Sequence, residues 1–467
     1  MEDIREGKQP NSTIASHQIN PHDAGTITKD TGVLLALFAV GLIIGSPVLG
    51  YLGDRMKRRQ IPMLLGMVGL LGSTLLFLFA SQYWELLVAR FLQGFSSSCV
   101  WTLGMCLIAD TFPVQTLGLQ MGKTLLAHSI GLVMGAPRKV NDDRRKQCII
   151  PSSNSSVALF QHYGYRAPFI LCVALTGLDF LLRLFLVERR NRPKEWFESP
   201  PVTASVLSEA IANVPEPTKQ QVSSLQLLRS PRLWTCLIIA FSQGTVFNVF
   251  EPTLTVRLPL EFGLNSSQVG LVFLAQVLPD FVSAPLAGYL TDRYGPKVVC
   301  LVNLIVCAIT VALMGIPSST TPGGIAPLIV IFALQGFSAF AFVAPVLPEL
   351  TQIVKGYNPD GGDDGQARSY AFFNIAFASG ALVGPIIGGY MYASIGFFWM
   401  CITMAVFLVL CAPLIYFYMG EPGKFIVRQA ENASKKEEMR DQLSRCESDG
   451  VSASDTSRAN VTVTRKE

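Results

Sequence analysis

Charged side chains are scarce in this sequence, since Asp, Glu, Lys and Arg together make up 15% of its 467 residues while half of them are apolar. So little charge cannot cover the surface of a soluble multidomain chain, and the composition predicts a polytopic membrane protein. Residues 1–30 are polar and have no basic start followed by an apolar run, so they lack the pattern of a signal peptide. The first insertion signal therefore lies further along the chain.

The residue patterns of catalytic and metal sites are also missing. The sequence has only four histidines, no Cys-x-x-Cys pair, no nucleophile elbow and no phosphate loop of the Gly-x-x-x-x-Gly-Lys type. Its ten cysteines are scattered, mostly within apolar runs, where they are most simply small core residues. We therefore expect no enzymatic activity, no cofactor, no metal site and no nucleic-acid partner.

What the chain does contain is a series of apolar runs, each long enough to cross roughly 30 Å of hydrocarbon. They lie at about 33–53, 60–81, 84–109, 119–137, 166–187, 233–256, 268–290, 297–316, 325–348, 370–394 and 397–419. The fold class is therefore an all-α polytopic membrane protein with about eleven spans.

Basic residues give the orientation, because Lys and Arg near the span ends favour the cytoplasmic side. If the spans alternate in direction, ten basic residues fall on one side: Arg55, Lys57, Arg58, Arg59, Arg189, Arg190, Arg192, Lys194, Arg293 and Lys297. We expect this side to be cytoplasmic and the N-terminus to lie outside.

The domain organisation follows from an internal repeat. Three pairs of matches recur in the same order about 240 positions apart: GYLGDR at 50–55 with GYLTDR at 288–293, LQGFS at 92–96 with 334–338, and Gly135 with Gly384, each just before a proline. The sequence thus predicts two homologous halves. The predicted segments are a polar start at 1–30, a first half at 31–187, a proline-rich cytoplasmic linker at 188–230, a second half at 231–420 and a disordered charged tail at 421–467.

The repeat also exposes two irregularities in the first half. The run at 233–256 has no apolar counterpart about 240 positions earlier, so the first half is expected to lack its opening span. The stretch from Gly135 to Gly164 is about 17 residues longer than its counterpart in the second half. The extra residues lie within 138–157, and several of them are charged. Our hypothesis is that an alternative exon or untranslated sequence explains this insert.

Several motifs resemble those of the major facilitator superfamily. The Gly-x-Leu-x-Asp-Arg loops are found there in both halves, and Arg-x-x-Gln-Gly at 90–94 and Gly-x-x-x-Gly-Ala-Pro at 131–137 are similar to motifs of its drug:proton antiporters with twelve spans. The segments 250–254 (FEPTL) and 369–377 (SYAFFNIAF) look like the vesicular amine transporter-like branch common in fungi. The resemblance implies two pseudo-symmetric helical bundles that transport by alternating access.

The repeated loop predicts a contact between helices. An aspartate at the end of one helix can face the positive N-terminal end of a neighbour, and Arg58 can pair with an acid such as Asp110. The resemblance implies that these contacts latch the cytoplasmic face, whereas the plain alternative leaves Asp54 solvated. The candidate latch residues are Gly50, Asp54, Arg55, Arg58, Asp110, Gly288, Asp292 and Arg293.

Small residues at a spacing of four predict close helix packing in both halves. The stripes contain Gly131 and Gly135 in the first half and Gly380 and Gly384 in the second, and each is followed by a further packing candidate, Pro137 or Pro385. The resemblance implies an antiporter signature in the first set, which the insert after Pro137 interrupts.

Ionisable residues within membrane helices mark transport pathways. Glu251, flanked by Asn248 and Pro252, is the first candidate, because burial favours a protonated carboxyl and a nearby cationic substrate favours the ionised form. Asp280 and Glu349 are weaker candidates, for which interhelical hydrogen bonding is the alternative.

Other candidates for the pathway come from the resemblance. It implies that Arg90, with Gln93 on the same face, shapes proton transfer, although Arg90 near a helix end could simply snorkel to the interface. Asn374 stands where amine-carrying relatives have an aspartate, and an amide can bind a substrate but cannot exchange a proton. Tyr370 and nearby phenylalanines could line an amphipathic pocket or merely pack.

The expected function is secondary active export of small amphipathic or cationic compounds in exchange for protons, as in multidrug efflux. The expected partners are a small-molecule substrate, protons and the lipid bilayer, the protein acting as a monomer in the plasma membrane or a vacuolar or vesicular membrane. Two alternatives remain open: an uncoupled facilitator, and a non-transporting incomplete isoform that acts as a membrane partner.

Overall fold

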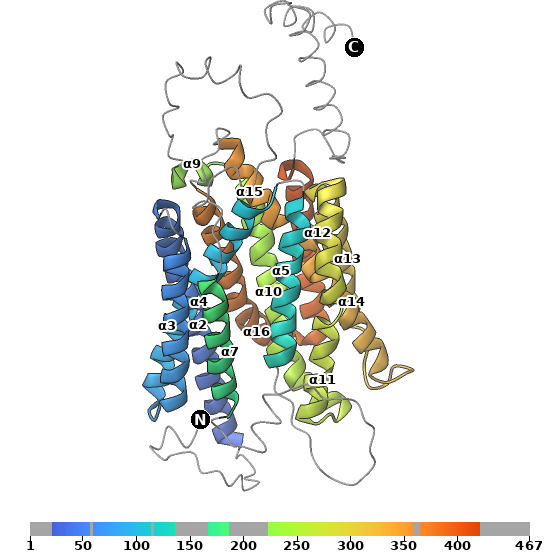
Figure 1. Ribbon diagram of the computed structural model, residues 1–467. Coiled ribbons are helices and arrows are strands. Elements are labelled where there is room, and N and C mark those ends of the chain that lie inside the picture. Colours follow the sequence, from blue (N-terminus) through green and yellow to red (C-terminus); the bar gives the residue numbers. More distant parts are fainter. Residues whose placement is uncertain are drawn as a thin grey trace, which may run out of the picture.

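The computed structural model describes residues 21–56, 59–113, 116–135, 167–185, 223–357 and 365–420, and their regular structure is helical throughout (Figure 1). The helices of the first half are α2 (Pro21–Arg55), α3 (Gln60–Phe79), α4 (Tyr83–Thr111), α5 (Leu117–Gly135) and α7 (Ala167–Leu184). Those that follow are α9 (Ser224–Leu228), α10 (Pro231–Phe262), α11 (Ser266–Val277), α12 (Asp280–Tyr294), α13 (Pro296–Leu313), α14 (Ala326–Val343), α15 (Val346–Tyr357) and α16 (Gln366–Tyr418).

These helices form two groups, as the repeat predicts. In the first group, α2 packs on α4, and α3 lies between α4 and α7; in the second, α10 and α13 pack on α16, and α14 packs on α13. Figure 1 shows the first group side by side, with α5 running along α12. Two helix pairs form the largest contacts between the halves: α2 with α16, and α5 with α12.

Eight helices in the described ranges are long and apolar enough to cross a membrane. All eleven predicted runs fall on described helices, but α5 and α7 are outside these eight, and the last two runs are merged in α16. Within α16, Gly396 has φ 81° and is not helical, which gives a physical break between those two runs. The count of eleven spans remains a prediction.

In Figure 1 the ends of α2 and α12 lie at the same end of the bundle as the starts of α5 and α16. We call this the basic end, because it carries Arg55, Arg59, Arg293 and Lys297. A tight turn at Gly295, with φ 92°, joins α12 to α13 there, a conformation that glycine adopts without steric cost.

Some predicted segments differ from the structure or fall outside it. The polar start was expected to extend to residue 30, but α2 already begins at Pro21. Residues 138–157, 188–222 and 421–467 lie outside the described residues, so the insert, most of the linker and the tail are not tested.

Candidate functional site: polar contacts between the halves

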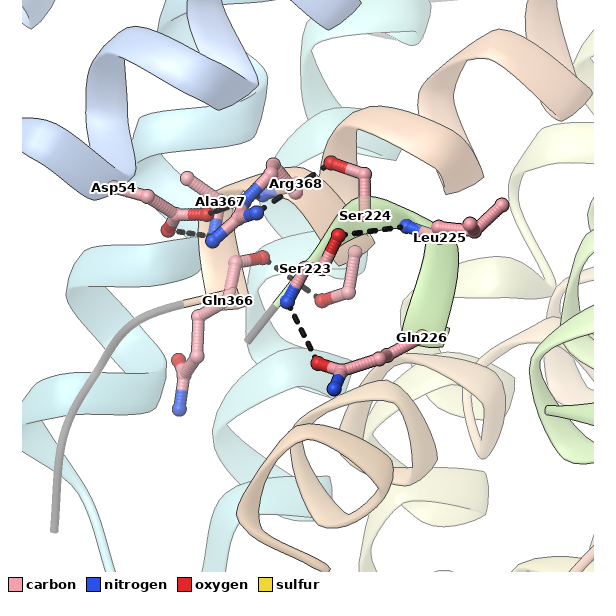
Figure 2. Close-up of polar contacts among 9 residues, drawn as sticks. Asp54, Ser223, Ser224, Leu225, Gln226, Gln366, Ala367 and Arg368 are labelled. Atoms are coloured by element: carbon pink, nitrogen blue, oxygen red, sulfur yellow. Dashed lines mark hydrogen bonds and ion pairs between the residues drawn. The ribbon is translucent and has the colours of Figure 1, made fainter. Parts of the chain in front are cut away.

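Asp54, the next to last residue of α2, contacts the N-terminus of α16 from the other half. Its carboxylate accepts hydrogen bonds from the backbone N–H of Ala367 at 2.9 Å and of Arg368 at 3.3 Å, and from Arg368 Nε at 2.6 Å. The Asp54 side chain is only 2% exposed. Figure 2 shows the carboxylate turned toward these two residues. The alternative of a solvated Asp54 is therefore wrong.

Asp292 makes the equivalent contact on α12. Its two carboxylate oxygens accept hydrogen bonds from the backbone N–H groups of Gly118 and Leu119, each at 2.8 Å. Such amides at the start of a helix have no partner within it, and the helix dipole favours an anion there. The approach of each repeated aspartate to a helix N-terminus, predicted from the sequence, is thus observed in both copies.

The glycine of each repeated loop permits this approach. A Cβ atom placed on Gly288 would collide with the backbone of Gly118 and Leu119, and one on Gly50 would lie 2.6 Å from the Cβ of Ala371. A larger residue at either position would push the carboxylate of the same loop away from the opposing helix. The glycine and the aspartate therefore act together.

The basic residues of the first loop divide into two environments. Arg59 forms a buried ion pair with Asp110 at 2.6 Å, the two side chains being 1% and 8% exposed. The sequence had suggested Arg58 as this partner, but Arg58 lies outside the described residues. Arg55 is exposed and stacks over the ring of Tyr51.

Arg293, in the second loop, is exposed and donates a hydrogen bond to the Tyr289 hydroxyl at 3.3 Å. Like Arg55, it packs on a tyrosine of its own helix.

Sequence reasoning missed Arg368 and Ser224. Arg368 Nη1 donates a hydrogen bond to Ser224 Oγ of α9 at 3.4 Å, so its guanidinium lies between α2 and the end of the linker (Figure 2). The sequence offers one signal for Arg368, which is a basic residue two positions before the apolar run that begins at residue 370. Because 314 positions separate Arg368 from Asp54, nothing local pairs them.

A second level of polar contacts joins the same helix pairs further into the bundle. Asn374 Nδ2 donates a hydrogen bond to Ser46 Oγ at 2.8 Å between α16 and α2. Ser129 Oγ of α5 lies at hydrogen-bond distance, 2.7 Å, from Asp280 Oδ2 of α12, and Ser283 Oγ donates to Oδ1 at 3.0 Å. Two of the predicted pathway residues, Asn374 and Asp280, therefore lie at the interface between the halves.

Glu251 lies apart from these contacts. Its side chain is exposed on α10 and forms no hydrogen bond or ion pair with another described side chain, while Asn248, one turn earlier, donates to the Gly244 carbonyl at 2.8 Å. Pro252, next to Glu251, lies within α10, which continues through it to Phe262.

Arg90 and Gln93 are brought together, as their spacing predicts. Arg90 Nη1 donates to Gln93 Oε1 at 2.9 Å, and the guanidinium lies over the Phe77 ring. Arg90 is half-buried, so it does not simply extend from the bundle.

Glu349 and Tyr370 serve contacts within the second half. Glu349 is fully buried, pairs with Arg232 at 2.6 Å and accepts a hydrogen bond from the Gly420 backbone N–H at 3.0 Å. The hydroxyls of Tyr370 and Thr351 lie 2.7 Å apart. These contacts tie α15 to α10 and α16, which favours the interhelical alternative for Glu349 and a packing role for Tyr370.

The two glycine stripes differ in the structure. A Cβ on Gly380 or Gly384 would collide with backbone atoms of α10, so the close packing predicted there is present. At Gly131 the prediction is not met among the described residues, because none of their atoms lies within 4 Å of such a Cβ. The reason is that α10, which fills the stripe in the second half, has no described counterpart beside α5.

The remaining packing residues are tested less fully. Pro385 lies within α16. The surroundings of Gly135, and all of Pro137, fall outside the described residues.

Comparisons with known proteins agree on one class. The chain is 26% identical over 371 residues to an uncharacterized MFS-type transporter of Schizosaccharomyces pombe, covering 77% of this chain and 79% of that one. It is 25% identical over 432 residues to the synaptic vesicular amine transporter of Mus musculus, covering 90% and 74% of the two chains.

Solved structures show the same fold. The human organic anion transporter MFSD10 (TETRAN) matches with a TM-score of 0.58 at 18% identity, covering 82% of this chain and 83% of that chain. FucP, a Major Facilitator Superfamily transporter crystallised in the outward conformation, matches with a TM-score of 0.59 at 15% identity, covering 90% and 94%.

The profile of the Major Facilitator Superfamily matches residues 12–260 and 237–446 of this chain, which together include both repeated loops. The chain is therefore a multi-pass integral membrane protein of the secondary-transporter type, and it belongs to the Major Facilitator Superfamily.

Proposed function

We propose that this protein exports small amphipathic or cationic compounds in exchange for protons, by alternating access and as a monomer. The observation that carries the proposal is the pair of contacts made by Asp54 and Asp292, both between the halves and both at the basic end. Rocking the halves apart at this end breaks both contacts together. They therefore act as the latch of a cytoplasmic gate, with the basic end facing the cytoplasm.

The strength of these contacts suits a gate. A hydrogen bond to a charged group contributes about 1.5–3 kcal/mol where water is excluded. Moving a two-state equilibrium from 1:99 to 99:1 takes about 5.5 kcal/mol. The contacts of Asp54 and Asp292 thus hold the basic end closed, and differential binding of a substrate or a proton elsewhere is sufficient to open it.

The substrate class is inferred from Glu251 and from the vesicular amine transporters among the relatives. Glu251 is the acid of α10 that is exposed and unpaired with described side chains, so it is accessible to a cation. When a cationic compound displaces the proton of this carboxyl, one positive charge replaces another, which is the exchange that an antiporter requires. Asn374 does not take over this role, because an amide exchanges no proton.

The test uses purified protein in liposomes, an imposed pH gradient and ethidium, a planar aromatic cation, as the probe. We expect the wild type to accumulate ethidium against its gradient only on the acidic side, and Glu251→Gln to lose this accumulation. Asp179→Asn is the matched control, since Asp179 is 46% exposed and its ion-pair partner among the described residues is Arg183 on its own helix.

Two other results would decide against the proposal. Ethidium that equilibrates at the same rate in wild type and Glu251→Gln, whatever the pH gradient, indicates an uncoupled facilitator. Ethidium that stays outside as it does in protein-free liposomes indicates a non-transporting membrane protein.

A further inference from the structure

Asp280 is a fully buried carboxyl group in the interface between the halves. It is the first residue of α12 and follows Pro279, at the break between α11 and α12. Its oxygens contact Ser129 of the opposing α5 and Ser283 of its own helix. It is thus the acid that joins the two halves away from the basic end.

Its depth places it within the membrane. Twelve positions separate Asp280 from Asp292 on one helix, which corresponds to about 18 Å at 1.5 Å per residue. Ser129 lies 11 positions beyond Gly118 on α5, which corresponds to about 17 Å. Because the hydrocarbon core is roughly 30 Å thick, the pair lies near its middle.

No cation balances this carboxyl among the described residues. The helices packed against Asp280 are α5, α11, α13 and α14, and neither α11 nor α14 carries a charged residue. The charged or titratable groups of the others and of α12 are Lys123, His128, Tyr289, Asp292, Arg293, Tyr294, Lys297, Cys300 and Cys307, none of which forms a hydrogen bond or ion pair with Asp280. An unpaired carboxylate buried at this depth costs several kcal/mol, whereas the neutral acid does not.

The hydrogen bonds around Ser129 point to the same protonation state. Ser129 Oγ lies 2.7 Å from Asp280 Oδ2 and 3.1 Å from the carbonyl oxygen of Leu125. A hydroxyl has one hydrogen to donate, and a carbonyl only accepts. If Asp280 is protonated, its O–H donates to Ser129, Ser129 donates to Leu125, and Ser283 donates to Oδ1, so that one proton satisfies every contact.

We propose that Asp280 is a second proton site, distinct from Glu251, and that the proton it carries holds α5 against α12 while the basic end is closed. Loss of the proton to water leaves a carboxylate, which is unstable in the dry interface and gains hydration when the halves separate. Proton release to the cytoplasmic side is thereby coupled to opening. At the corresponding α2 and α16 interface the contact is the neutral pair Asn374 and Ser46, so only one interface depends on the proton.

This inference rests on the proposed proton antiport, and its test requires no substrate. In the infrared spectrum at neutral pH, we expect the C=O stretching band of a protonated carboxyl that is absent from Asp280→Asn and retained in Glu251→Gln. Ser129→Ala keeps the acid but removes its partner across the interface, so this band should shift to higher frequency. The shift reports the contact even if Asp280→Asn folds poorly.

Hydrogen exchange measures the coupling to the gate. After correction for the intrinsic pH dependence of exchange, we expect the amides of Gly118 and Leu119 in the wild type to lose protection as the pH rises, because Asp280 ionises and the basic end opens. Asp280→Asn should stay protected at every pH, since its amide donates to Ser129 as the protonated acid does. Glu251→Gln should follow the wild type.

Identical carboxyl bands in wild type and Asp280→Asn overturn the inference, as does an unchanged pH dependence of exchange in this variant. The ethidium experiment is scored separately. If Asp280 gives both expected results but ethidium transport is not coupled to protons, the proposed antiport is refuted and Asp280 remains a pH-controlled contact between the halves. If ethidium transport is coupled to protons but Asp280→Asn changes neither the carboxyl band nor the exchange, only the second proton site is refuted.

Discussion

The substitution Gly288→Ala tests whether close backbone approach maintains the gate. The added Cβ would lie 2.8 Å from the carbonyl carbon and still closer to the carbonyl oxygen of Gly118, and 3.1 Å from Leu119 Cα. Carbon atoms in contact prefer about 3.5–4.0 Å. All three neighbours are backbone atoms, so no side chain can rotate away, and α5 must move from α12 by about 1 Å.

Such a displacement removes the contact made by Asp292. Its two hydrogen bonds to Gly118 and Leu119 are 2.8 Å long, and an added 1 Å takes them beyond hydrogen-bond range. At about 1.5 kcal/mol or more for each bond to a charged group, the closed conformation loses about 3 kcal/mol. Since 1.4 kcal/mol is a factor of ten, the equilibrium should shift about a hundredfold toward the form open at the basic end.

Hydrogen exchange followed by mass spectrometry provides the readout, on a peptide that contains the amides of Gly118 and Leu119. We expect their protection to fall about a hundredfold in Gly288→Ala, in line with the change in population. Gly131→Ala is the matched control on α5, because no atom of the described part of the chain lies within 4 Å of the added Cβ. Wild-type protection in Gly288→Ala, or an equal loss in Gly131→Ala, would refute the reasoning.

Two further predictions concern the first repeated loop. Arg368→Gln removes the 2.6 Å ion pair with Asp54 but keeps both backbone contacts, for a loss of about 1.5 kcal/mol. The hydrogen-exchange rate of the amides at the start of α16 should therefore rise by about one order of magnitude. An unchanged exchange rate there would show that the guanidinium contributes nothing. Asp110→Ala leaves the guanidinium of Arg59 buried without its ion-pair partner, which costs about 3–5 kcal/mol. Its apparent melting temperature in detergent should drop clearly below that of the wild type, and an equal melting temperature would contradict a stabilising role for this pair.

Part of the interface was readable from the sequence because it is repeated. The recurrence of GYLGDR as GYLTDR marked Asp54 and Asp292 as equivalent, and the general affinity of a carboxylate for a helix N-terminus predicted the kind of partner. The helix N-termini themselves, at Ala367 and Gly118, were not predicted, since pairing between residues 174 to 314 positions apart depends on how whole helices pack.

Other residues show where local reasoning ends. The sequence made Glu251 the leading acid because it lies deep in an apolar run, and it treated Asp280 as a weaker candidate beside a proline. The structure separates them by their neighbours, since Asp280 contacts a serine of the opposite half, whereas the Glu251 side chain forms no hydrogen bond or ion pair with a described side chain. Gly131 and Gly380 likewise match in sequence, but only Gly380 faces a helix that fills its stripe.

The sequence by itself determined the membrane class, the helical composition, the two-fold repeat and the family, because apolar length and recurring loops are properties of the chain in order. Only the tertiary structure decided which helices join the halves and which polar groups meet there. The physical reason is that a carboxyl group between helices is defined by its hydrogen-bond partners. Asp54 has its partners on α16, Asp292 on α5, and Asp280 on α5 and in the first turn of its own helix. Only packing brings the partners from the other half to these carboxyl groups.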